Sequence, residues 1–408
     1  MYEPVHLLMI TINNNNKYYD MIKINDSEFE ARYGRVGASQ QVRRYSLALW
    51  NKKYNEKVAK GYKDMSDMVA EAVEKEKPSG PKEYEDIKNK VIADIVEKLQ
   101  NLAKKTVSEN YKVNASVVTQ KMIDSAQDLL DNLVGFDGTV EEFNKSLLEL
   151  FTIIPRKMGN VNDYLVNSKD EFDKKIAKES DILDTMRSQV YVKDITQDST
   201  NNEQEQVIHK GTILEALGLE IEEVTDDEIK MIKKLMNESK DKFKKAWKVT
   251  NLKTQKRFDD FVKSEKIKDT RLLFHGSRSE NFWSILQTGL VLRPTNAVIT
   301  GKMFGYGIYY SPHCQKSIGY TSLNGSYWAK GNNNTAYMAL FDVAYGNPYD
   351  VYDFDSKYYN LNYDKLQEFK KGANCLHAHK DKGMLRNDEI VVYKEEQMTI
   401  KYLIEIGN

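Results

Sequence analysis

The chain has 408 residues, of which 40% are hydrophobic and 30% charged, and its formal net charge is −1. This composition excludes fibrous and disordered proteins and predicts a globular chain of two to four domains. With this net charge the protein as a whole is not a polycation that coats nucleic acid. Any DNA binding therefore requires a local patch of basic residues. The sequence has no apolar run long enough for a transmembrane helix, and residues 1–16 carry no secretory signal. Its two cysteines predict a reducing compartment, without a zinc finger or a disulfide framework.

Residues 1–77 predict a small antiparallel sheet with a helix packed on it. Strand-like runs at 5–12, 18–24 and 29–36 are separated by polar turns. A helical pattern follows over residues 45–60. Six basic residues and one acidic residue lie between Arg43 and Lys60, which indicates either a DNA-binding patch or a solvated helix face.

Residues 83–192 predict an all-helical block. Apolar residues recur at helical spacing over 87–102 and 118–133. Thr139 and Glu142 have the spacing of a capping box and open a further apolar helix over 143–154. Another helix is expected over about 169–189. The polar segment 194–206 is predicted to be a mobile linker.

Residues 207–408 return to a mixed α/β pattern. A helix is expected over 226–247, and strands at 272–274, 307–310, 336–347, 389–396 and 399–406. The strand at 272–274 delivers a His, a Gly and a Ser at its end. Ser317 and Tyr320 lie on a helix-like segment after the next strand. Such residues at strand and helix ends suit a pocket that grips a flat polar ring.

Five motifs of this third block occur in the order found in poly(ADP-ribose) polymerases. They are LLFHGS (272–277), TGKMFGYGIYYSP (300–312), KSIGY (316–320), ALFDVAYGNPY (339–349) and NDEIVVY (387–393). The block therefore resembles the ADP-ribosyltransferase catalytic domain of that family. YGRVG (33–37) resembles the WGR domain, and LLELFTIIPRKMG (147–159) resembles the helical regulatory domain. The resemblance implies a multidomain α+β protein like the short DNA-dependent members, with a WGR-like domain at 1–77, a helical domain at 83–192 and a catalytic domain at 207–408.

The resemblance implies roles for the residues around the nicotinamide of NAD. Gly276 would pair its backbone N–H and C=O with the carboxamide, and Ser317 would add a hydroxyl. Tyr320 would stack on the ring, with Tyr309 as the other wall. NAD is then a substrate, and no metal is expected.

The adenosine half has its own implied contacts. His275 would hydrogen-bond the 2′-hydroxyl of the adenosine ribose, and Ser277 and Asn281 lie where the family contacts this half. The arginine that the family places near residues 291–292 is absent, and Arg293 is a candidate substitute.

Glu389 occupies the place of the glutamate that completes the family's His-Tyr-Glu set with His275 and Tyr309. Alignment on the downstream Val-Tyr pair selects Glu389 over Asp388, and neighbours on a strand face opposite ways. The carboxylate would bind the nicotinamide ribose, stabilise the cation that develops as NAD is cleaved, and polarise the acceptor. Its presence favours polymer synthesis.

The N-terminal block departs from the family pattern at Tyr33, which replaces the tryptophan of WGR. Tyrosine still offers an aromatic face that can stack on a sugar or base, and the Arg35 guanidinium can still bind a phosphate. Arg43 and Arg44 complete the candidate DNA-binding set.

The sequence thus predicts an NAD-dependent poly(ADP-ribosyl)transferase that modifies proteins, including itself, and that DNA breaks activate through the WGR-like domain. The segment between Gly372 and Glu389 is shorter than is usual in the family, so a mono-ADP-ribosyltransferase is the alternative. A non-catalytic scaffold that binds DNA ends is a third hypothesis. We expect a monomer without DNA and no membrane partner, located in the cytoplasm near the nucleoid if bacterial and in the nucleus if eukaryotic. His377 and His379 lack an acidic or cysteine partner at ligand spacing in the sequence, so they predict no metal site.

Overall fold

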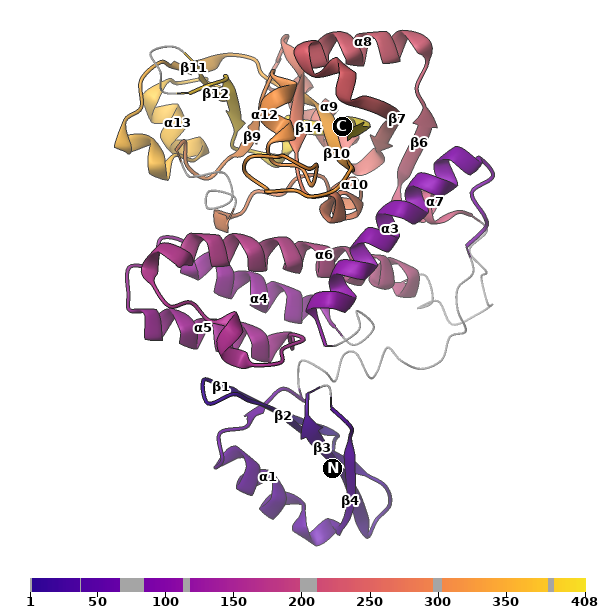
Figure 1. The fold of residues 1–408 in the computed structure, drawn as a ribbon, viewed down its shortest axis with the longest axis vertical. Coiled ribbons are helices and arrows are strands. Elements are labelled where there is room, and N and C mark those ends of the chain that lie inside the picture. The colour runs from indigo at the N-terminus through magenta and orange to yellow at the C-terminus, as the bar shows by residue number, and fades with distance from the viewer. Residues whose placement is uncertain are drawn as a thin grey trace. The chain divides into compact units, whose positions relative to one another are not determined.

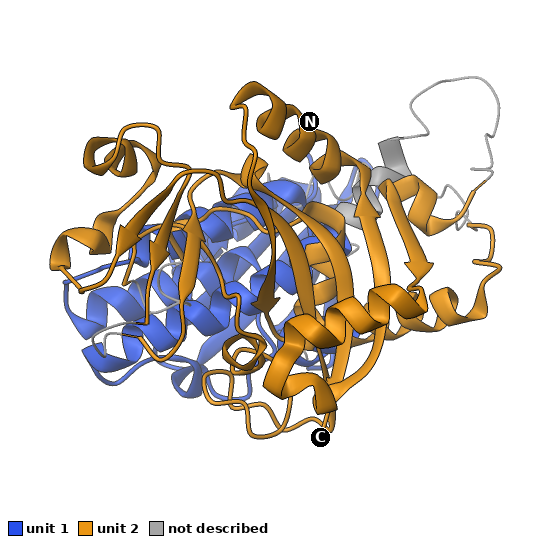
Figure 2. Cartoon of the chain, turned by 90° about the horizontal axis from the view of Figure 1, so that it is seen from above, with its two compact units in different colours: residues 1–82, 104–204 blue, residues 83–103, 205–408 orange. Residues whose placement is uncertain are grey.

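A computed structural model describes residues 2–36, 38–66, 84–112, 118–198, 211–295, 303–380 and 385–408 (Figure 1). The chain divides into two compact units (Figure 2). Unit 1 comprises residues 1–82 and 104–204, and unit 2 comprises residues 83–103 and 205–408. The division falls within α3 (Lys90–Asn110), so the start of the predicted helical block groups with unit 2. The mixed α+β class is confirmed, whereas the three domain boundaries stay predictions.

A five-stranded sheet with strand order β4-β3-β2-β1-β5 forms the N-terminal part of unit 1. The hairpins from β1 to β3 are the meander that the polar turns predicted. Phe29 and Trp50 lie in the core under this sheet, with their rings packed edge to face at 5.0 Å. The elements are β1 (Val5–Thr11), β2 (Asn15–Lys23), β3 (Glu28–Arg35), β4 (Gln41–Ser46), α1 (Trp50–Val58) and β5 (Lys63–Asp64).

The helix expected over 45–60 is shorter than predicted. Residues 41–46 form β4, which pairs with β3 along its whole length. A 3-10 turn at Leu47–Leu49 then leads into α1. Arg43 and Arg44 therefore lie on an edge strand, whereas Lys52, Lys53 and Lys57 lie on α1. Backbone pairing with β3 outweighs the local helical pattern at residues 45–46.

The rest of unit 1 contains the described helices α4 (Gln120–Leu133), α5 (Val140–Ile153) and α6 (Phe172–Asp198). The Thr139 hydroxyl accepts a hydrogen bond from the Glu142 N–H, and the Glu142 carboxylate accepts one from the Thr139 N–H. These two bonds confirm the predicted capping box at the start of α5. Phe143 of α5 stacks on Phe172 of α6 with ring centroids 3.9 Å apart. The helix α6 continues to Asp198, which contradicts the prediction that the linker begins at residue 194. The remainder of that linker, residues 199–206, lies outside the described residues.

Two described sheets form the body of unit 2. One has the strand order β6-β7-β14-β10-β8 and the other β11-β12-β13-β9. The strands are β6 (Leu219–Glu223), β7 (Phe243–Asn251), β8 (Thr270–Gly276), β9 (Ile308–Tyr310), β10 (Thr335–Ala344), β11 (Pro348–Val351), β12 (Cys375–Ala378), β13 (Glu389–Val392) and β14 (Met398–Gly407). The helices are α7 (Ile213–Leu217), α8 (Asp226–Met236), α9 (Leu252–Ser264), α10 (Phe282–Thr288), α12 (Cys314–Ile318) and α13 (Tyr363–Phe369).

One prediction for unit 2 is wrong. Residues 226–247 were expected to form one helix, but α8 ends at Met236 and residues from Phe243 onward form β7. In β7, Ala246, Trp247 and Val249 are buried, and the strand pairs with β14. The apolar residues of this segment pack in the core of a sheet. The spacing of apolar residues alone does not distinguish a buried strand from a buried helix.

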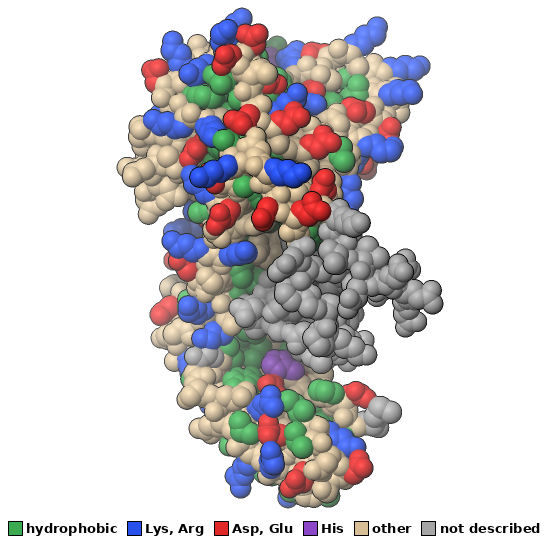
Figure 3. All heavy atoms as spheres, turned by 90° about the vertical axis from the view of Figure 1, so that its right-hand side faces the viewer, with side chains coloured by type: hydrophobic (Ala, Val, Ile, Leu, Met, Phe, Trp, Pro, Cys, Tyr) green, Lys and Arg blue, Asp and Glu red, His purple; other side chains and the backbone are tan. Residues whose placement is uncertain are grey.

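Among the described residues, no helix combines the length and the apolar character needed to cross a membrane. On the face drawn in Figure 3, Lys and Arg side chains are interspersed with Asp and Glu side chains, in keeping with the near-zero net charge.

A buried ion pair lies inside unit 1. Arg156 and Glu179 are each 2% exposed and meet at 2.9 Å between Nη1 and Oε2. Lys175 reaches the other carboxylate oxygen of Glu179, also at 2.9 Å. The Glu179 carboxylate thus compensates two cations that have little contact with water.

We predict that Glu179→Ala lowers the free energy of unfolding by about 3–5 kcal/mol, because it leaves buried cations uncompensated. Urea denaturation of the full-length protein, followed by circular dichroism, measures the change. Glu109→Ala is the matched control, since the Glu109–Lys105 pair is exposed, and we expect it to cost less than about 1 kcal/mol. Equal effects of the two variants would contradict the prediction.

Candidate active site

The two sheets of unit 2 are joined at the ends of β8 and β9. The Phe274 N–H donates to the Ser311 carbonyl at 2.9 Å, and the Ser311 N–H donates to the Phe274 carbonyl at 3.1 Å. The Ser311 hydroxyl donates to the carbonyl of Asp388 at 3.0 Å. Strand ends from both sheets therefore meet, and they carry His275, Gly276 and Glu389.

Gly276 at the end of β8 lies against α12. A Cβ atom on Gly276 would lie 1.9 Å from the carbonyl oxygen of Ser317, so only glycine allows this approach. Ser317 is buried in α12. Tyr320 follows the helix, and its N–H donates to the Ser317 carbonyl at 3.1 Å. The structure thus brings together Gly276, Ser317 and Tyr320, three of the four residues that the sequence assigned to a flat ring.

One face of the Tyr320 ring has an aromatic neighbour. Tyr320 and Trp328 stack with centroids 5.9 Å apart and an interplanar angle of 20°. Trp328 is 58% exposed. The sequence analysis did not single out Trp328, because it lies outside the five motifs.

His275 is held by the backbone of β9. Its Nδ1 lies 3.1 Å from the Tyr309 carbonyl oxygen, which can only accept. Nδ1 therefore carries the proton, and Nε2 is left as an acceptor. Burial lowers the pKa of His275 to about 4, despite the hydrogen bond to Tyr309. The imidazole is thus neutral at neutral pH.

Tyr309 has a different setting from the one its predicted role suggests. Its hydroxyl accepts from the Phe304 N–H at 3.0 Å and donates to the Gly305 carbonyl at 3.1 Å. Its ring lies in a core cluster with Val391 and Tyr393. The next residue, Tyr310, is the one whose ring packs near His275, at 5.8 Å between centroids. The stacking role of Tyr309 stays a prediction.

Glu389 begins β13 and is only 6% exposed. Its carboxylate forms an ion pair with Lys316 of α12. Burial raises the pKa of Glu389, and the Lys316 ammonium opposes this rise. Burial also raises the pKa of Tyr320, with a further contribution from the Glu389 charge. The carboxylate, the ammonium and the Tyr320 phenol therefore share one site.

Lys316 is a site residue that the sequence analysis missed. The sequence feature that could have indicated it is its position in the motif KSIGY, directly before Ser317. Nothing in the sequence indicated which carboxylate it meets, because Glu389 lies on a strand of a separate segment.

Asp388, the rejected alternative to Glu389, has other partners. Its side chain accepts from His377 at 3.1 Å and from the Lys380 N–H at 3.0 Å. The two neighbouring carboxylates thus have separate surroundings.

The predicted adenosine contacts lie close together. The Asn281 amide donates to the Ser277 hydroxyl at 3.1 Å, and Asn281 is buried in a 3-10 turn before α10. Both side chains follow directly on β8 and are near His275 in the chain.

The candidate DNA-binding residues lie in unit 1, on β3 and β4. Arg35 donates to the carbonyl and side-chain oxygens of Asn14 at 2.9 and 2.8 Å, and to the Gly159 carbonyl at 2.8 Å. Its guanidinium therefore already ties the sheet to the loop after α5. Tyr33 stacks on Tyr19 with centroids 5.5 Å apart.

Arg43 and Arg44 are exposed on the edge strand β4. Arg43 lies over the Tyr45 ring at 5.2 Å, and Arg44 lies 3.6 Å from Glu30. Of the predicted set, these two arginines have the most accessible guanidinium groups. Gly37 of the YGRVG motif lies outside the described residues.

Comparison with known proteins places this site in a family. Residues 226–408 match the family described as the poly(ADP-ribose) polymerase catalytic domain. The assignment of residues 1–77 and 83–192 to WGR and helical domains stays a prediction.

Three relatives illustrate the similarity. The uncharacterized protein 101L of Invertebrate iridescent virus 6 is 35% identical over 198 residues, which are 48% of this chain and 81% of the relative. The putative poly [ADP-ribose] polymerase-like 100L of the same virus is 35% identical over 193 residues, or 46% and 97% of the two chains. Poly [ADP-ribose] polymerase 2 of Arabidopsis thaliana is 30% identical over 170 residues, 37% of this chain and 25% of the relative.

The catalytic-domain match and these relatives support ADP-ribosyltransferase activity and imply that NAD is the substrate. The chain belongs to the poly(ADP-ribose) polymerase family.

Proposed function

We propose that this chain is an NAD-dependent poly(ADP-ribosyl)transferase that releases nicotinamide and extends ADP-ribose chains on proteins. The observation that carries the proposal is the buried Glu389 carboxylate, paired with Lys316 beside Gly276, Ser317 and Tyr320. Such a carboxylate suits both parts of the reaction, the cleavage of NAD and the activation of an acceptor hydroxyl.

The reaction breaks the bond between the nicotinamide nitrogen and C1′ of the ribose. Nicotinamide leaves with the bonding electrons, and positive charge develops on C1′ and the ring oxygen. An ionised Glu389 stabilises that charge in a site of low dielectric. The acceptor oxygen then bonds to C1′, and its proton passes to the carboxylate.

Lys316 favours the ionised form of Glu389. Burial raises the pKa of this carboxyl, and the Lys316 ammonium in contact with it opposes the rise. We assign Lys316 as a residue that sets the charge state of Glu389.

The leaving group is held at the junction of β8 and α12. The backbone of Gly276 and the hydroxyl of Ser317 are suited to a carboxamide, and the Tyr320 ring to the nicotinamide face. A neutral His275 with Nε2 as acceptor can receive a hydrogen bond from a ribose hydroxyl.

We also propose that DNA breaks activate the enzyme through the N-terminal sheet. Exposed Arg43 and Arg44 on β4 support this, because guanidinium groups on an edge strand can contact phosphates. The likeness of YGRVG to the WGR motif supports it further.

Labelled NAD, with and without nicked DNA, tests the proposal on the full-length protein. We expect a smear of protein-linked polymer that strengthens with nicked DNA, and its loss in Glu389→Gln. Glu220→Gln is the control, since Glu220 is exposed on β6. A single ADP-ribose step would favour the mono-transferase, and no incorporation under either condition would contradict both.

A second prediction concerns pH. Nicotinamide release should fall as the pH decreases through the raised pKa of Glu389, because protonation removes the negative charge. In Lys316→Met the opposing cation is lost, so the acid limb of the pH profile should move to higher pH. Lys316→Arg should restore it. An unmoved acid limb in Lys316→Met, measured where the variant still turns over, would contradict the role of Lys316.

The third prediction separates ring binding from chemistry. Gly276→Ala should weaken benzamide binding at least about fivefold, since overpacking a tight contact costs about 1–3 kcal/mol. Isothermal titration measures the affinity. Gly159→Ala is the control, because no atom lies within 4 Å of a Cβ at that position. Unchanged binding by Gly276→Ala would exclude this ring site.

A further inference from the structure

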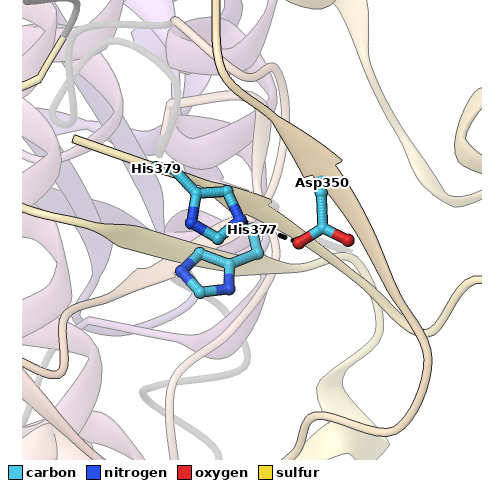
Figure 4. A group of neighbouring side chains, drawn as sticks. All are labelled: Asp350, His377 and His379. Carbon is cyan, nitrogen blue, oxygen red and sulfur yellow. Dashed lines mark hydrogen bonds and ion pairs between the residues drawn. The ribbon is translucent and has the colours of Figure 1, made fainter. Parts of the chain in front are cut away.

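Two histidines and an aspartate form a cluster on the second sheet of unit 2 (Figure 4). The strands β11 and β12 run parallel with Asp350 opposite His377. His377 and His379 are two residues apart, so both side chains lie on the face that carries Asp350. The parallel pairing supplies the acidic partner that the sequence around the histidines lacks.

His379 contacts both of the other side chains. His379 Nε2 lies 2.8 Å from Asp350 Oδ1, and the rings of His377 and His379 stack with centroids 3.9 Å apart. Tyr352 stacks on His379 at 4.5 Å, nearly parallel to it. One donor atom from each of the three residues lies within 4.8 Å of the others.

We propose that Asp350, His377 and His379 bind a divalent transition-metal ion, for which zinc has the best-matched chemistry. Two imidazoles and one carboxylate are a known ligand set for zinc, with the fourth position left to water. Zinc bonds of about 2.0–2.2 Å need donor atoms roughly 3.3 Å apart, so the side chains must rotate to bring the three donor atoms, which lie within 4.8 Å of one another, into range.

The surroundings of His377 fit a metal ligand. One ring nitrogen lies 2.7 Å from the Tyr345 hydroxyl and the other 3.1 Å from Asp388. Whichever nitrogen binds the metal, the other keeps a partner that fixes the ring, as metal-bound histidines usually have. Asp350 and Asp388 supply two negative charges near a dication.

The cluster is also open to an ion from solution. The side chain of Asp350 is 40% exposed and that of His379 is 21% exposed, whereas His377 is 11% exposed. Among the described residues, no other group of three His, Cys, Asp or Glu side chains has donor atoms this close. His6, for comparison, forms an ion pair with Asp20.

Metal binding here would affect β13, the strand that begins at Glu389. Asp388 holds His377 and directly precedes Glu389, and His377 pairs with Ile390 across β12 and β13. An ion on Asp350, His377 and His379 would therefore cross-link β11 to the strand pair that ends at Glu389.

Titration of the full-length protein, freed of metal with EDTA and dialysed, tests the site. Zn²⁺ is followed by calorimetry, and Co²⁺ by the visible absorption that tetrahedral coordination produces. We expect one ion per chain. Asp350→Asn and His379→Ala should each weaken binding more than about 100-fold, since even the loss of an orienting partner costs about 10–100-fold.

His6→Ala is the matched control, because His6 also contacts an aspartate but lies in unit 1. It should bind the metal as the unaltered protein does. Circular dichroism of each metal-free variant checks its fold, and two variants at exposed positions are used so that one remains informative. Absence of Zn²⁺ binding, or unchanged binding in Asp350→Asn and His379→Ala, would overturn the proposal.

Discussion

The backbone bridge between Phe274 and Ser311 is the contact on which the candidate active site depends. It joins the edge of one sheet to the edge of the other, and the Ser311 hydroxyl adds a bond to the Asp388 carbonyl. The junction places the end of β8, which carries His275, beside β9, and β9 pairs with β13, which begins at Glu389. Backbone hydrogen bonds suit this task, because they hold position independently of the side chains that perform the chemistry.

Buried ion pairs serve two purposes in this chain. In unit 1, Glu179 compensates Arg156 and Lys175, and all three are largely withdrawn from water. In unit 2, Lys316 faces Glu389 and opposes the effect of burial on its pKa. The first arrangement lies in a helical core, whereas the second favours the charged form of the carboxylate that we propose acts in catalysis. The same physics of desolvation underlies both.

Local patterns predicted the elements whose stabilisation is local. The capping box at Thr139 and the hairpins of the first block were correct because turns and caps involve residues close in sequence. The helix expected over 226–247 was wrong after Met236, and β4 was not foreseen. Strand pairing decided both outcomes: β7 pairs with β14, which is distant in sequence, and β4 pairs with the preceding strand β3.

By itself the sequence pointed to the family, through five motifs in order, and with it predicted Gly276, Ser317, Tyr320 and Glu389 as site residues. Only the tertiary structure showed that Lys316 meets Glu389, that Arg35 is engaged by Asn14, and that Asp350 joins the two histidines. The reason is physical. A motif records which residue types occur together along the chain, whereas a charge or a metal ligand is defined by the atoms opposite it, and those come from strands and helices that are distant in sequence.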